Sequence, residues 1–391
     1  MPAIETYNFS GKKAIIRVDF NVPLNDKFEI TDDTRILAAL PTIKKVLADG
    51  GAVILMSHLG RPKGEVQEKF SLKHVVAHLS AKLGVDVKMA PDCVGAEVKA
   101  MADDLKMGEV MLLENLRFHN AETKGEEEFS KQLSELADVY VNDAFGTAHR
   151  AHASTTIIAK YFDEKMAGYL LDKEIKFLGD TVSNPERPFV AIVGGAKVSG
   201  KLEVLKSLIE KVDTILIGGG MAYTFLKAQG HGIGGSLVED DLIDTAKQIL
   251  VDAKAKGVNF MLPTDNLAAD KFADDADIQV VGVEIPEGRM ALDVGPDTVK
   301  AYSAEIAGAK TIVWNGPMGC FEMPNFSKGT FGVCEAVAAS AATSIIGGGD
   351  SVAAVNQSGL ADKMSHISTG GGASLEYLEG KVLPGVEAVT K

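Results

Sequence analysis

The sequence predicts an α/β protein with two doubly wound parallel-sheet (Rossmann-like) domains joined by a hinge helix. Three observations lead to this fold class. The 391 residues exceed what one ordinary core accommodates, so two domains are expected. Strand-like runs alternate with amphipathic helical stretches along the whole chain. The strand-like runs are almost continuously apolar, as expected for parallel strands that are covered by helices on both faces.

The strand-like runs are spread over both halves of the chain. The first half contains KAIIRVDF, GAVILMSH, VDVKMAP, GEVMLLEN and DVYVNDA, and the second half contains PFVAIVGG, DTILIGGG, VNFMLPT, IQVVGVEI, TIVWNGP and TSIIGGG. Helical patterns between them include SLKHVVAHLSAKLG, EEEFSKQLSELA, VSGKLEVLKSLIEKV and EDDLIDTAKQILVDAKAKG. A charged, helix-like stretch over residues 170–188 separates the halves, and we place the domain boundary there.

Composition excludes several classes of protein. The net charge is −14 and no basic stripe is present, which argues against nucleic acid as a partner. No apolar run approaches the ~20 residues of a membrane helix, so we expect no membrane association. The N-terminus has no apolar signal region, and Cys93, Cys320 and Cys334 lie too far apart for a disulfide framework or a metal motif. We therefore expect a cytoplasmic protein.

Arginine is scarce and unevenly placed. Only seven of the 40 basic residues are arginine, and five of these precede residue 151: Arg17, Arg35, Arg61, Arg117 and Arg150. Arg61, Arg117 and Arg150 come just after strand-like runs, beside histidines. Each arginine alone is better explained as a solvated or structural residue than as a ligand. Because ligands of open α/β sheets bind beyond the carboxyl ends of the strands, the arginines together favour an anionic substrate.

The second half carries glycine-rich turns at the ends of its strands: GGAKVSGK, LIGGGMAY, NGPMG and IIGGGDS. Residues 195–202 follow the phosphate-loop pattern GxxxxGK, but Leu202 occupies the position where Ser or Thr would hold Mg²⁺. If this half binds a Mg-nucleotide, the metal ligand must therefore come from elsewhere, and Asp350, on its own glycine turn, is the candidate. The alternative is that Asp350 is only the N-cap of the helix that follows.

The chain resembles the phosphoglycerate kinase family through a set of motifs in the family's order. These are RVDFNVPL, DDTRI, MSHLGRPKG, LLENLRF, NDAFGTAHRAHAS, GGAKVSGK, GGGMAYTF, TIVWNGPMGCFE, GGGDSVAA and STGGGASLEYLEGKVLPGV. The resemblance implies a monomeric glycolytic enzyme. It would transfer the γ-phosphoryl group of ATP to the carboxylate of 3-phosphoglycerate, giving 1,3-bisphosphoglycerate and ADP, with Mg²⁺.

The same resemblance implies roles for individual residues. Substrate binding is implied at Asp19, Phe20, Asn21, Arg35, His58, Leu59, Gly60, Arg61, Arg117 and Arg150. Nucleotide binding is implied at Gly195, Lys197, Lys201, Gly219, Pro317, Glu322, Gly348, Gly349, Asp350 and Ser351, with Asp350 as the Mg²⁺ ligand. Catalytic roles are implied for Arg35, Lys197, Lys201, Gly348 and Gly349.

We expect residues 1–170 to bind 3-phosphoglycerate and residues 188–372 to bind the nucleotide. Residues 171–187 would form the hinge helix, and residues 373–391 would return to the first domain. Closure on binding both substrates is expected, with Gly370, Gly371 and Gly372 as further hinge candidates.

Two other functions were considered. An NAD-dependent oxidoreductase would need a GxGxxG directly after a strand, and the one match, at residues 230–235, follows a helix. A non-catalytic two-lobed binding protein would not need Arg35, Lys201 and Asp350.

Overall fold

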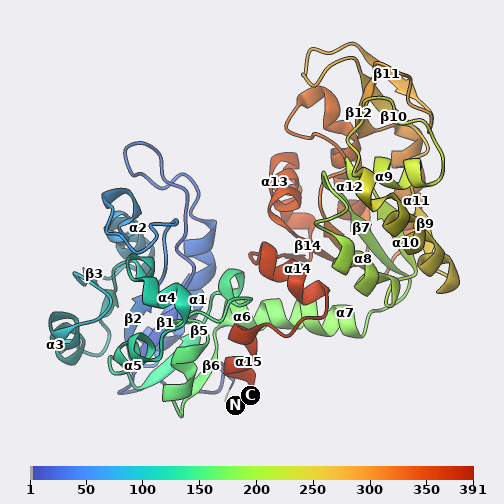
Figure 1. Cartoon of the computed structure of the whole chain (residues 1–391). Helices are drawn as coiled ribbons and strands as arrows, with labels where there is room; N and C mark the ends of the chain where they lie inside the picture. The colour runs from blue at the N-terminus through green and yellow to red at the C-terminus, as the bar shows by residue number, and fades with distance from the viewer. Residues whose placement is uncertain (1–2) are drawn as a thin grey trace. The chain divides into compact units, whose positions relative to one another are not determined.

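The computed structural model describes residues 3–391, except the side chain of Asp180, and divides into two compact units (Figure 1). Unit 1 runs to Ile175 and also includes Val382–Lys391, and unit 2 is Lys176–Lys381. The chain passes from one to the other through α6 (Tyr169–Glu174), a π-helical stretch (Ile175–Asp180) and α7 (Thr181–Ser183). The helix-like stretch predicted over 170–188 is therefore present, with a π-helical turn that its composition does not indicate.

Unit 1 is built on a six-stranded sheet in which all the strands are parallel, in the order β3-β4-β2-β1-β5-β6. Its strands are β1 (Lys13–Arg17), β2 (Ala52–Met56), β3 (Val87–Met89), β4 (Val110–Leu112), β5 (Val139–Asn142) and β6 (Lys165–Ala167). Its other helices are α1 (Thr34–Ala48), α2 (Lys73–Leu83), α3 (Ala96–Asp104), α4 (Asn120–Lys124), α5 (Glu127–Ser134) and α15 (Pro384–Thr390). Short 3₁₀ turns include η2 (Leu116–Phe118).

Unit 2 repeats this plan with a second six-stranded parallel sheet, in the order β15-β14-β13-β7-β8-β9. Its strands are β7 (Phe189–Val193), β8 (Thr214–Ile217), β9 (Asn259–Met261), β13 (Thr311–Asn315), β14 (Thr343–Gly347) and β15 (His366–Ile367). Its helices are α8 (Leu202–Ile209), α9 (Met221–Ala228), α10 (Ile243–Ala255), α11 (Pro296–Gly308), α12 (Lys328–Ala339), α13 (Gly349–Ser358) and α14 (Gly372–Leu378). The predicted fold class of two parallel-sheet domains is confirmed.

One strand-like run was predicted in the wrong kind of sheet. Residues 278–285 contribute β11 (Ile278–Val281) to a small antiparallel sheet of order β11-β10-β12, not to a buried parallel sheet. The central strand β10 (Asn266–Ala269) pairs with β11 on one side and with β12 (Met290–Val294) on the other. No residue of β11 is fully buried, which suits an edge strand covered on one face only.

The strand order places the ends of several strands around one point in each unit. In unit 1 the chain builds β2 on one side of β1 and later adds β5 on the other side. In unit 2 it builds β8 beside β7 and later adds β13 on the opposite side. Such reversals leave a crevice outside the carboxyl ends of the central strands, where ligands of open α/β sheets bind. No helix within residues 3–391 is both long enough and apolar enough to cross a bilayer.

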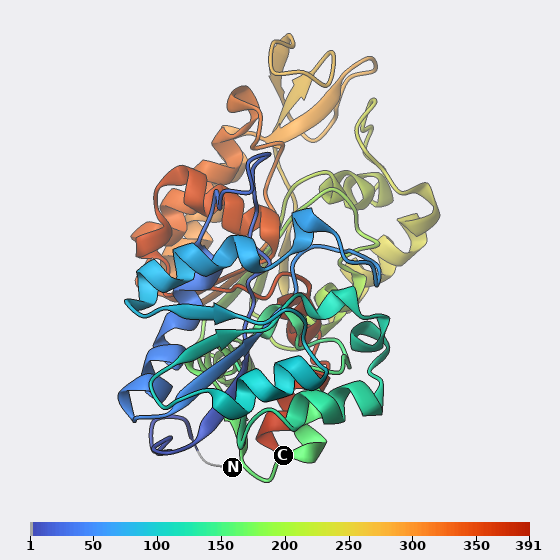
Figure 2. The same cartoon turned by 90° about the vertical axis from the view of Figure 1, so that its left-hand side faces the viewer.

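The C-terminal helix α15 packs on unit 1, beside β5 and β6 (Figures 1 and 2). Its Gly385 donates a backbone hydrogen bond to the Ala148 carbonyl at 2.8 Å, and its carbonyl accepts one from Asn142 Nδ2 at 3.0 Å. A Cβ atom at Gly385 would lie 2.9 Å from Ala148 Cα. The absence of a side chain therefore lets the tail approach the loop after β5.

We predict that Gly385→Ala destabilises unit 1 by roughly 1–3 kcal/mol, the usual cost of overpacking a buried contact. Urea unfolding followed by circular dichroism measures this. The control is Gly308→Ala at the end of α11, where the added methyl group meets no atom within 4 Å. That change should be neutral or stabilising by up to about 1 kcal/mol. Equal stability of the two variants would contradict the close-approach argument.

Candidate active site

Hydrogen bonds between backbone N–H groups and side-chain oxygens connect the loop after β1 to the loop after β2. Phe20 N donates to Ser57 Oγ at 2.8 Å, and Asn21 Oδ1 accepts from Gly60 N at 2.8 Å. Arg35, in the first turn of α1, donates to the Asn21 carbonyl. Its guanidinium lies 3.8 Å from Asp19 Oδ1. Arg35 and Asn21 line a cavity of about 350 Å³ with three neighbouring residues, Val22, Pro23 and Asp32.

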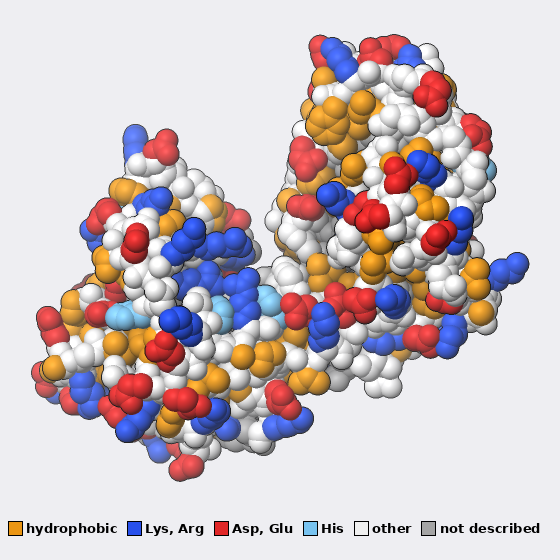
Figure 3. Space-filling model, in the orientation of Figure 1, with side chains coloured by type: hydrophobic (Ala, Val, Ile, Leu, Met, Phe, Trp, Pro, Cys, Tyr) orange, Lys and Arg blue, Asp and Glu red, His pale blue; other side chains and the backbone are white. Residues whose placement is uncertain are grey.

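A second cavity in unit 1, about 460 Å³ in volume, is lined by Arg61, Arg117 and Arg150, and we call it the arginine cavity. It is lined by Arg61, Lys63, Gly64, Arg117, Asn120, Thr123, Arg150 and His152. Lys and Arg side chains gather with histidines on this unit in the space-filling view (Figure 3). The structure thus brings together Arg61, Arg117 and Arg150, as predicted, but places Arg35 in a different cavity.

Arg117 is the most informative residue of the arginine cavity because it is only 8% exposed. One of its terminal nitrogens donates to the Gly60 carbonyl at 3.0 Å, but its Nε finds no hydrogen-bond partner among residues 3–391. Burial, together with the charges of Arg17 and Arg150, lowers the pKa of Arg117 to about 10. A buried cation with an unpaired donor is costly unless an anion binds to it.

The neighbouring histidines are electrostatically unsuited to acid–base chemistry at neutral pH. Burial, followed by the charges of Arg17 and Arg117, lowers the pKa of His58 well below its usual value. Burial and the same two arginines lower the pKa of His152 to about 4. Both rings are therefore neutral hydrogen-bonding groups. His58 Nδ1 lies 3.2 Å from the fully buried Arg17, so this predicted ligand packs beside the cavity instead of lining it.

Five residues of the cavity lining were not assigned to the substrate from the sequence: Lys63, Gly64, Asn120, Thr123 and His152. Lys63 has a positive φ of 58°, an uncommon backbone conformation that no sequence signal around it indicates. Asn120 opens α4 directly after the ENLRFH segment, so the proximity of Arg117 was its only signal.

Unit 2 contains a larger cavity, about 660 Å³, at the ends of β7, β8 and β13, which we call the glycine cavity. Predicted residues in its lining are Gly195, Gly219, Pro317, Glu322 and Asp350. Gly219 has a φ of 69°, and a Cβ atom there would lie 2.5 Å from the Gly195 carbonyl oxygen. Only glycine lets these two turns meet, so backbone groups form the floor of the cavity. Apolar residues missed from sequence complete the wall, among them Tyr223, Leu237, Phe272 and Met290.

Lys201 precedes α8, and its ammonium group donates to Asn315 Oδ1 at the end of β13. Burial lowers the pKa of Lys201 to about 8, although Asp350 and Glu379 act in the opposite direction. Asn315 Nδ2 is buried without a hydrogen-bond partner among the described residues. A Cβ atom at Gly348 would lie 2.9 Å from that nitrogen. Asn315 was not predicted, and its only signal was its place at a strand end in the NGPMG turn.

The turn from β14 to α13 tests one of the two interpretations of Asp350, the N-cap. The N-cap of α13 is Gly348, with φ of 88° and no side-chain capping hydrogen bond, and Asp350 lies exposed in the first turn. The N-cap interpretation of Asp350 is therefore wrong. Ser351 is fully buried, and its hydroxyl accepts a hydrogen bond from Gly316 N. Gly349 and Lys197 are exposed.

Comparison with known proteins identifies the family. The family model described as Phosphoglycerate kinase matches residues 4–381. The chain belongs to the phosphoglycerate kinase family. The phosphoglycerate kinase of Chloroherpeton thalassium is 55% identical over 391 residues, covering 99% of this chain and 98% of that protein. The protein named "Phosphoglycerate kinase, cytosolic" from Nicotiana tabacum is 56% identical, with coverage of 99% and 97%.

Solved structures agree with the sequence relatives. The phosphoglycerate kinase from Coxiella burnetii superimposes with a TM-score of 0.92 at 43% identity, covering 100% of this chain and 98% of that one. The enzyme from Pyrococcus horikoshii gives 0.85 at 32% identity, with the same coverage. The chain is a phosphotransferase that uses ATP and 3-phosphoglycerate, and neither alternative function is favoured by these matches.

The low pKa of Lys201 generates a prediction about pH. In the ligand-free protein, the ammonium group of Lys201 loses its proton above about pH 8. A phosphate bound beside it would favour the charged form. Mg-ADP binding should therefore take up a proton, and affinity should fall as pH rises from 8, by up to about tenfold per unit. Titration calorimetry at pH 7.0–9.5 in buffers of different ionisation enthalpy measures both effects. Lys201→Arg, which stays charged, is the control, and an equal pH slope in both proteins would contradict the assignment.

Proposed function

We propose that the arginine cavity of unit 1 binds the phosphate of 3-phosphoglycerate and that the glycine cavity of unit 2 binds Mg-nucleotide. The observation that carries the first half is the buried Nε of Arg117, which lacks a partner among the described residues. A phosphate oxygen satisfies that donor, and Arg61 and Arg150 supply further planar donors around the same cavity. Asp19 and Asn21, beside the other cavity, bind the glycerate part of the substrate.

Arg35 is assigned to the reacting end of the substrate. In the reaction, a carboxylate oxygen of 3-phosphoglycerate forms a bond to the γ-phosphorus while the bond to the ADP oxygen breaks. No general base is needed because the carboxylate is already ionised near neutral pH. Charge neutralisation and alignment of the reactants are the requirements that remain. Arg35 meets the first requirement: it lies apart from the arginine cavity and is held at the Asn21 carbonyl.

The glycine cavity suits a nucleotide in both chemistry and shape. Its apolar wall, with Pro317 and Gly219, accepts a flat base, and the exposed Glu322 carboxylate can accept hydrogen bonds from ribose hydroxyls. The first N–H groups of α13, from Gly349 onward, attract phosphate oxygens. Lys197 and Lys201 neutralise the phosphates, with Lys201 aimed by Asn315.

The residues present also fit Mg²⁺. Mg²⁺ prefers oxygen ligands and is commonly held by one or two carboxylates together with substrate phosphates. Asp350 offers an exposed carboxylate that makes no capping hydrogen bond, beside the turn assigned to phosphate. The ion, when bound, neutralises phosphate charge. The remaining expectations stay predictions: a monomer, a cytosolic location, hinge roles for residues 171–187 and 370–372, and closure on both substrates.

The two-cavity arrangement predicts different kinetic defects for two arginines. Arg35→Ala should lower kcat by ~10³ or more, because it removes a cation from the transferring group. Arg61→Ala should raise KM for 3-phosphoglycerate roughly 10- to 100-fold, the value of a charge-assisted hydrogen bond. Steady-state kinetics separate the two effects. Lys88→Ala on β3 removes an exposed charge from the same unit and should change neither constant. Identical kinetic profiles for the two arginine variants would refute the division of roles.

The assignment of Asp350 to Mg²⁺ predicts a metal-specific defect. Asp350→Ala should weaken binding of Mg-ADP but leave metal-free ADP nearly unaffected, since only the metal needs the carboxylate. It should also leave the melting temperature almost unchanged, because Asp350 caps no helix. Titration calorimetry with Mg²⁺ and with a chelator measures the difference. Asp362→Ala makes the same charge change in η8 (Ala361–Lys363) of the same unit as a control. Unaltered Mg-ADP affinity in Asp350→Ala would overturn the role.

A further inference from the structure

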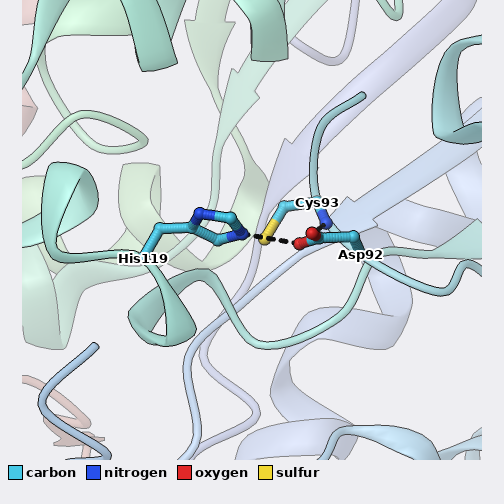
Figure 4. A group of neighbouring side chains, drawn as sticks. All are labelled: Asp92, Cys93 and His119. Atoms are coloured by element: carbon cyan, nitrogen blue, oxygen red, sulfur yellow. Dashed lines mark hydrogen bonds and ion pairs between the residues drawn. The ribbon is translucent and has the colours of Figure 1, made fainter. Parts of the chain in front are cut away.

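Three potential metal ligands converge in unit 1, outside both cavities described above (Figure 4). Asp92 and Cys93 lie in the loop after β3, and His119 lies between η2 and α4. One ligand atom from each, a carboxylate oxygen, the thiol sulfur and an imidazole nitrogen, all fall within 4.8 Å of one another. His119 Nε2 is hydrogen-bonded to Asp92 Oδ1 at 2.6 Å. It is the only such group of three or more found among residues 3–391.

The arrangement does not suit a nucleophilic cysteine. Cys93 is fully buried, and burial raises the pKa of its thiol well above the usual value, so the free thiol is protonated and inaccessible to a substrate. The Nε2 atom of His119 is hydrogen-bonded to Asp92. Activation of the Cys93 thiol by a base would instead require a hydrogen bond between the thiol and that nitrogen. The three ligand atoms surround one point, and they do not form a chain of hydrogen bonds that would pass a proton from the thiol to the imidazole.

The separations are close to those of a tetrahedral metal site. Bonds of ~2.0–2.3 Å from zinc to nitrogen, oxygen and sulfur place neighbouring ligand atoms roughly 3.3–3.8 Å apart. The 2.6 Å contact between His119 and Asp92 must open by about 1 Å, and the other pairs, no more than 4.8 Å apart, need to close by at most about 1 Å. Asp92 and His119 have side chains 45% and 32% exposed, so both can rotate and solvent can reach the fourth position.

We propose that Asp92, Cys93 and His119 form a binding site for a borderline-soft divalent cation of the zinc class. The metal would take the place of the proton shared by His119 Nε2 and Asp92 Oδ1, and that proton would pass to solvent, leaving a neutral imidazole that carries its hydrogen on Nδ1. Cys93 would release its thiol proton to solvent as the metal–sulfur bond forms. A thiolate and an imidazole select zinc over Mg²⁺, which prefers oxygen ligands, so the site is distinct in chemistry from Asp350.

The site is placed to affect the arginine cavity. His119 N donates to the Leu116 carbonyl at 3.1 Å, and the His119 carbonyl accepts from Glu122 N at 3.2 Å. His119 therefore joins the turn that carries Arg117 to the helix that begins with Asn120. Both of these residues line the arginine cavity. A metal that repositions His119 should shift them and weaken binding of 3-phosphoglycerate, an effect that rests on the function proposed for that cavity.

Metal binding is tested first, on the full chain without nucleotide. Titration with Zn²⁺ should show one site, weakened at least about tenfold in His119→Gln and Asp92→Asn, since even outer-shell partners contribute about 10–100-fold. Co²⁺ should give a near-ultraviolet thiolate charge-transfer band that Cys93→Ser abolishes. Because Asp92 and His119 are partly exposed, their variants should fold even if Cys93→Ser does not, and circular dichroism verifies this.

Two matched variants control for non-specific binding. His78→Gln removes a histidine that also pairs with a carboxylate, Asp33, at 2.9 Å in the same unit. Cys334→Ser removes a buried cysteine of unit 2. Both should bind Zn²⁺ as the unaltered protein does. The proposal is overturned if His119→Gln and the unaltered protein bind Zn²⁺ equally, or if the Co²⁺ complex lacks the thiolate band.

The link to the substrate is measured separately. Calorimetric titration with 3-phosphoglycerate, without ATP that would itself bind zinc, should show at least threefold weaker binding after loading with one equivalent of Zn²⁺. His119→Gln should show no such change. If zinc binds but 3-phosphoglycerate affinity is constant, the coupling is wrong. If metal-free protein does not bind 3-phosphoglycerate at all, the function proposed for the arginine cavity fails, whereas the zinc titration stands independently.

Discussion

The parallel pairing of β1 with β2 and β5, and of β7 with β8 and β13, is the constraint on which the rest of the structure depends. The carboxyl ends of parallel strands lie at the same edge of the sheet, so loops that are far apart in sequence lie close together at that edge. Asn21 can therefore bond to Gly60, and Lys201 can bond to Asn315. If the ladders were antiparallel, these loops would lie at opposite edges and neither site would form.

Both candidate sites keep polar groups that folding alone leaves unsatisfied. Arg117 Nε and Asn315 Nδ2 are buried without a partner among the described residues, and Lys201 is buried enough to lower its pKa to about 8. Each feature costs stability in the free protein. The anionic ligands proposed for these sites would relieve these costs, because phosphate oxygens would accept hydrogen bonds from Arg117 and favour the charged form of Lys201. The unpaired groups would therefore contribute to the affinity for an anionic ligand.

The sequence predicted the two sheets and named several residues that line the cavities, because long apolar runs and unusual residues are local signals. Arg35 at the start of α1 and Gly219 at a strand end could be recognised in this way. What it could not show depends on contacts between distant segments. The antiparallel pairing of β10 with β11 and β12 involves short strands, with β11 only partly buried. The position of Arg35 in DDTRI, at the start of a helix, did set it apart from the strand-end arginines, in agreement with its separate cavity.

The chain uses different chemistry for each kind of charge that it is proposed to bind. Unit 1 presents guanidinium groups, whose fixed fork of donors suits one phosphate held in a defined orientation. Unit 2 presents backbone N–H groups at glycine turns, which suit a polyphosphate that approaches the main chain closely. The cation sites differ in the same way. The exposed carboxylate of Asp350 suits hard Mg²⁺ bound together with phosphate, whereas the sulfur of Cys93 and the nitrogen of His119 suit a softer ion. Because ligand type separates the two proposed cation sites, a zinc-class ion bound in unit 1 would not need to compete with Mg²⁺ bound beside the nucleotide.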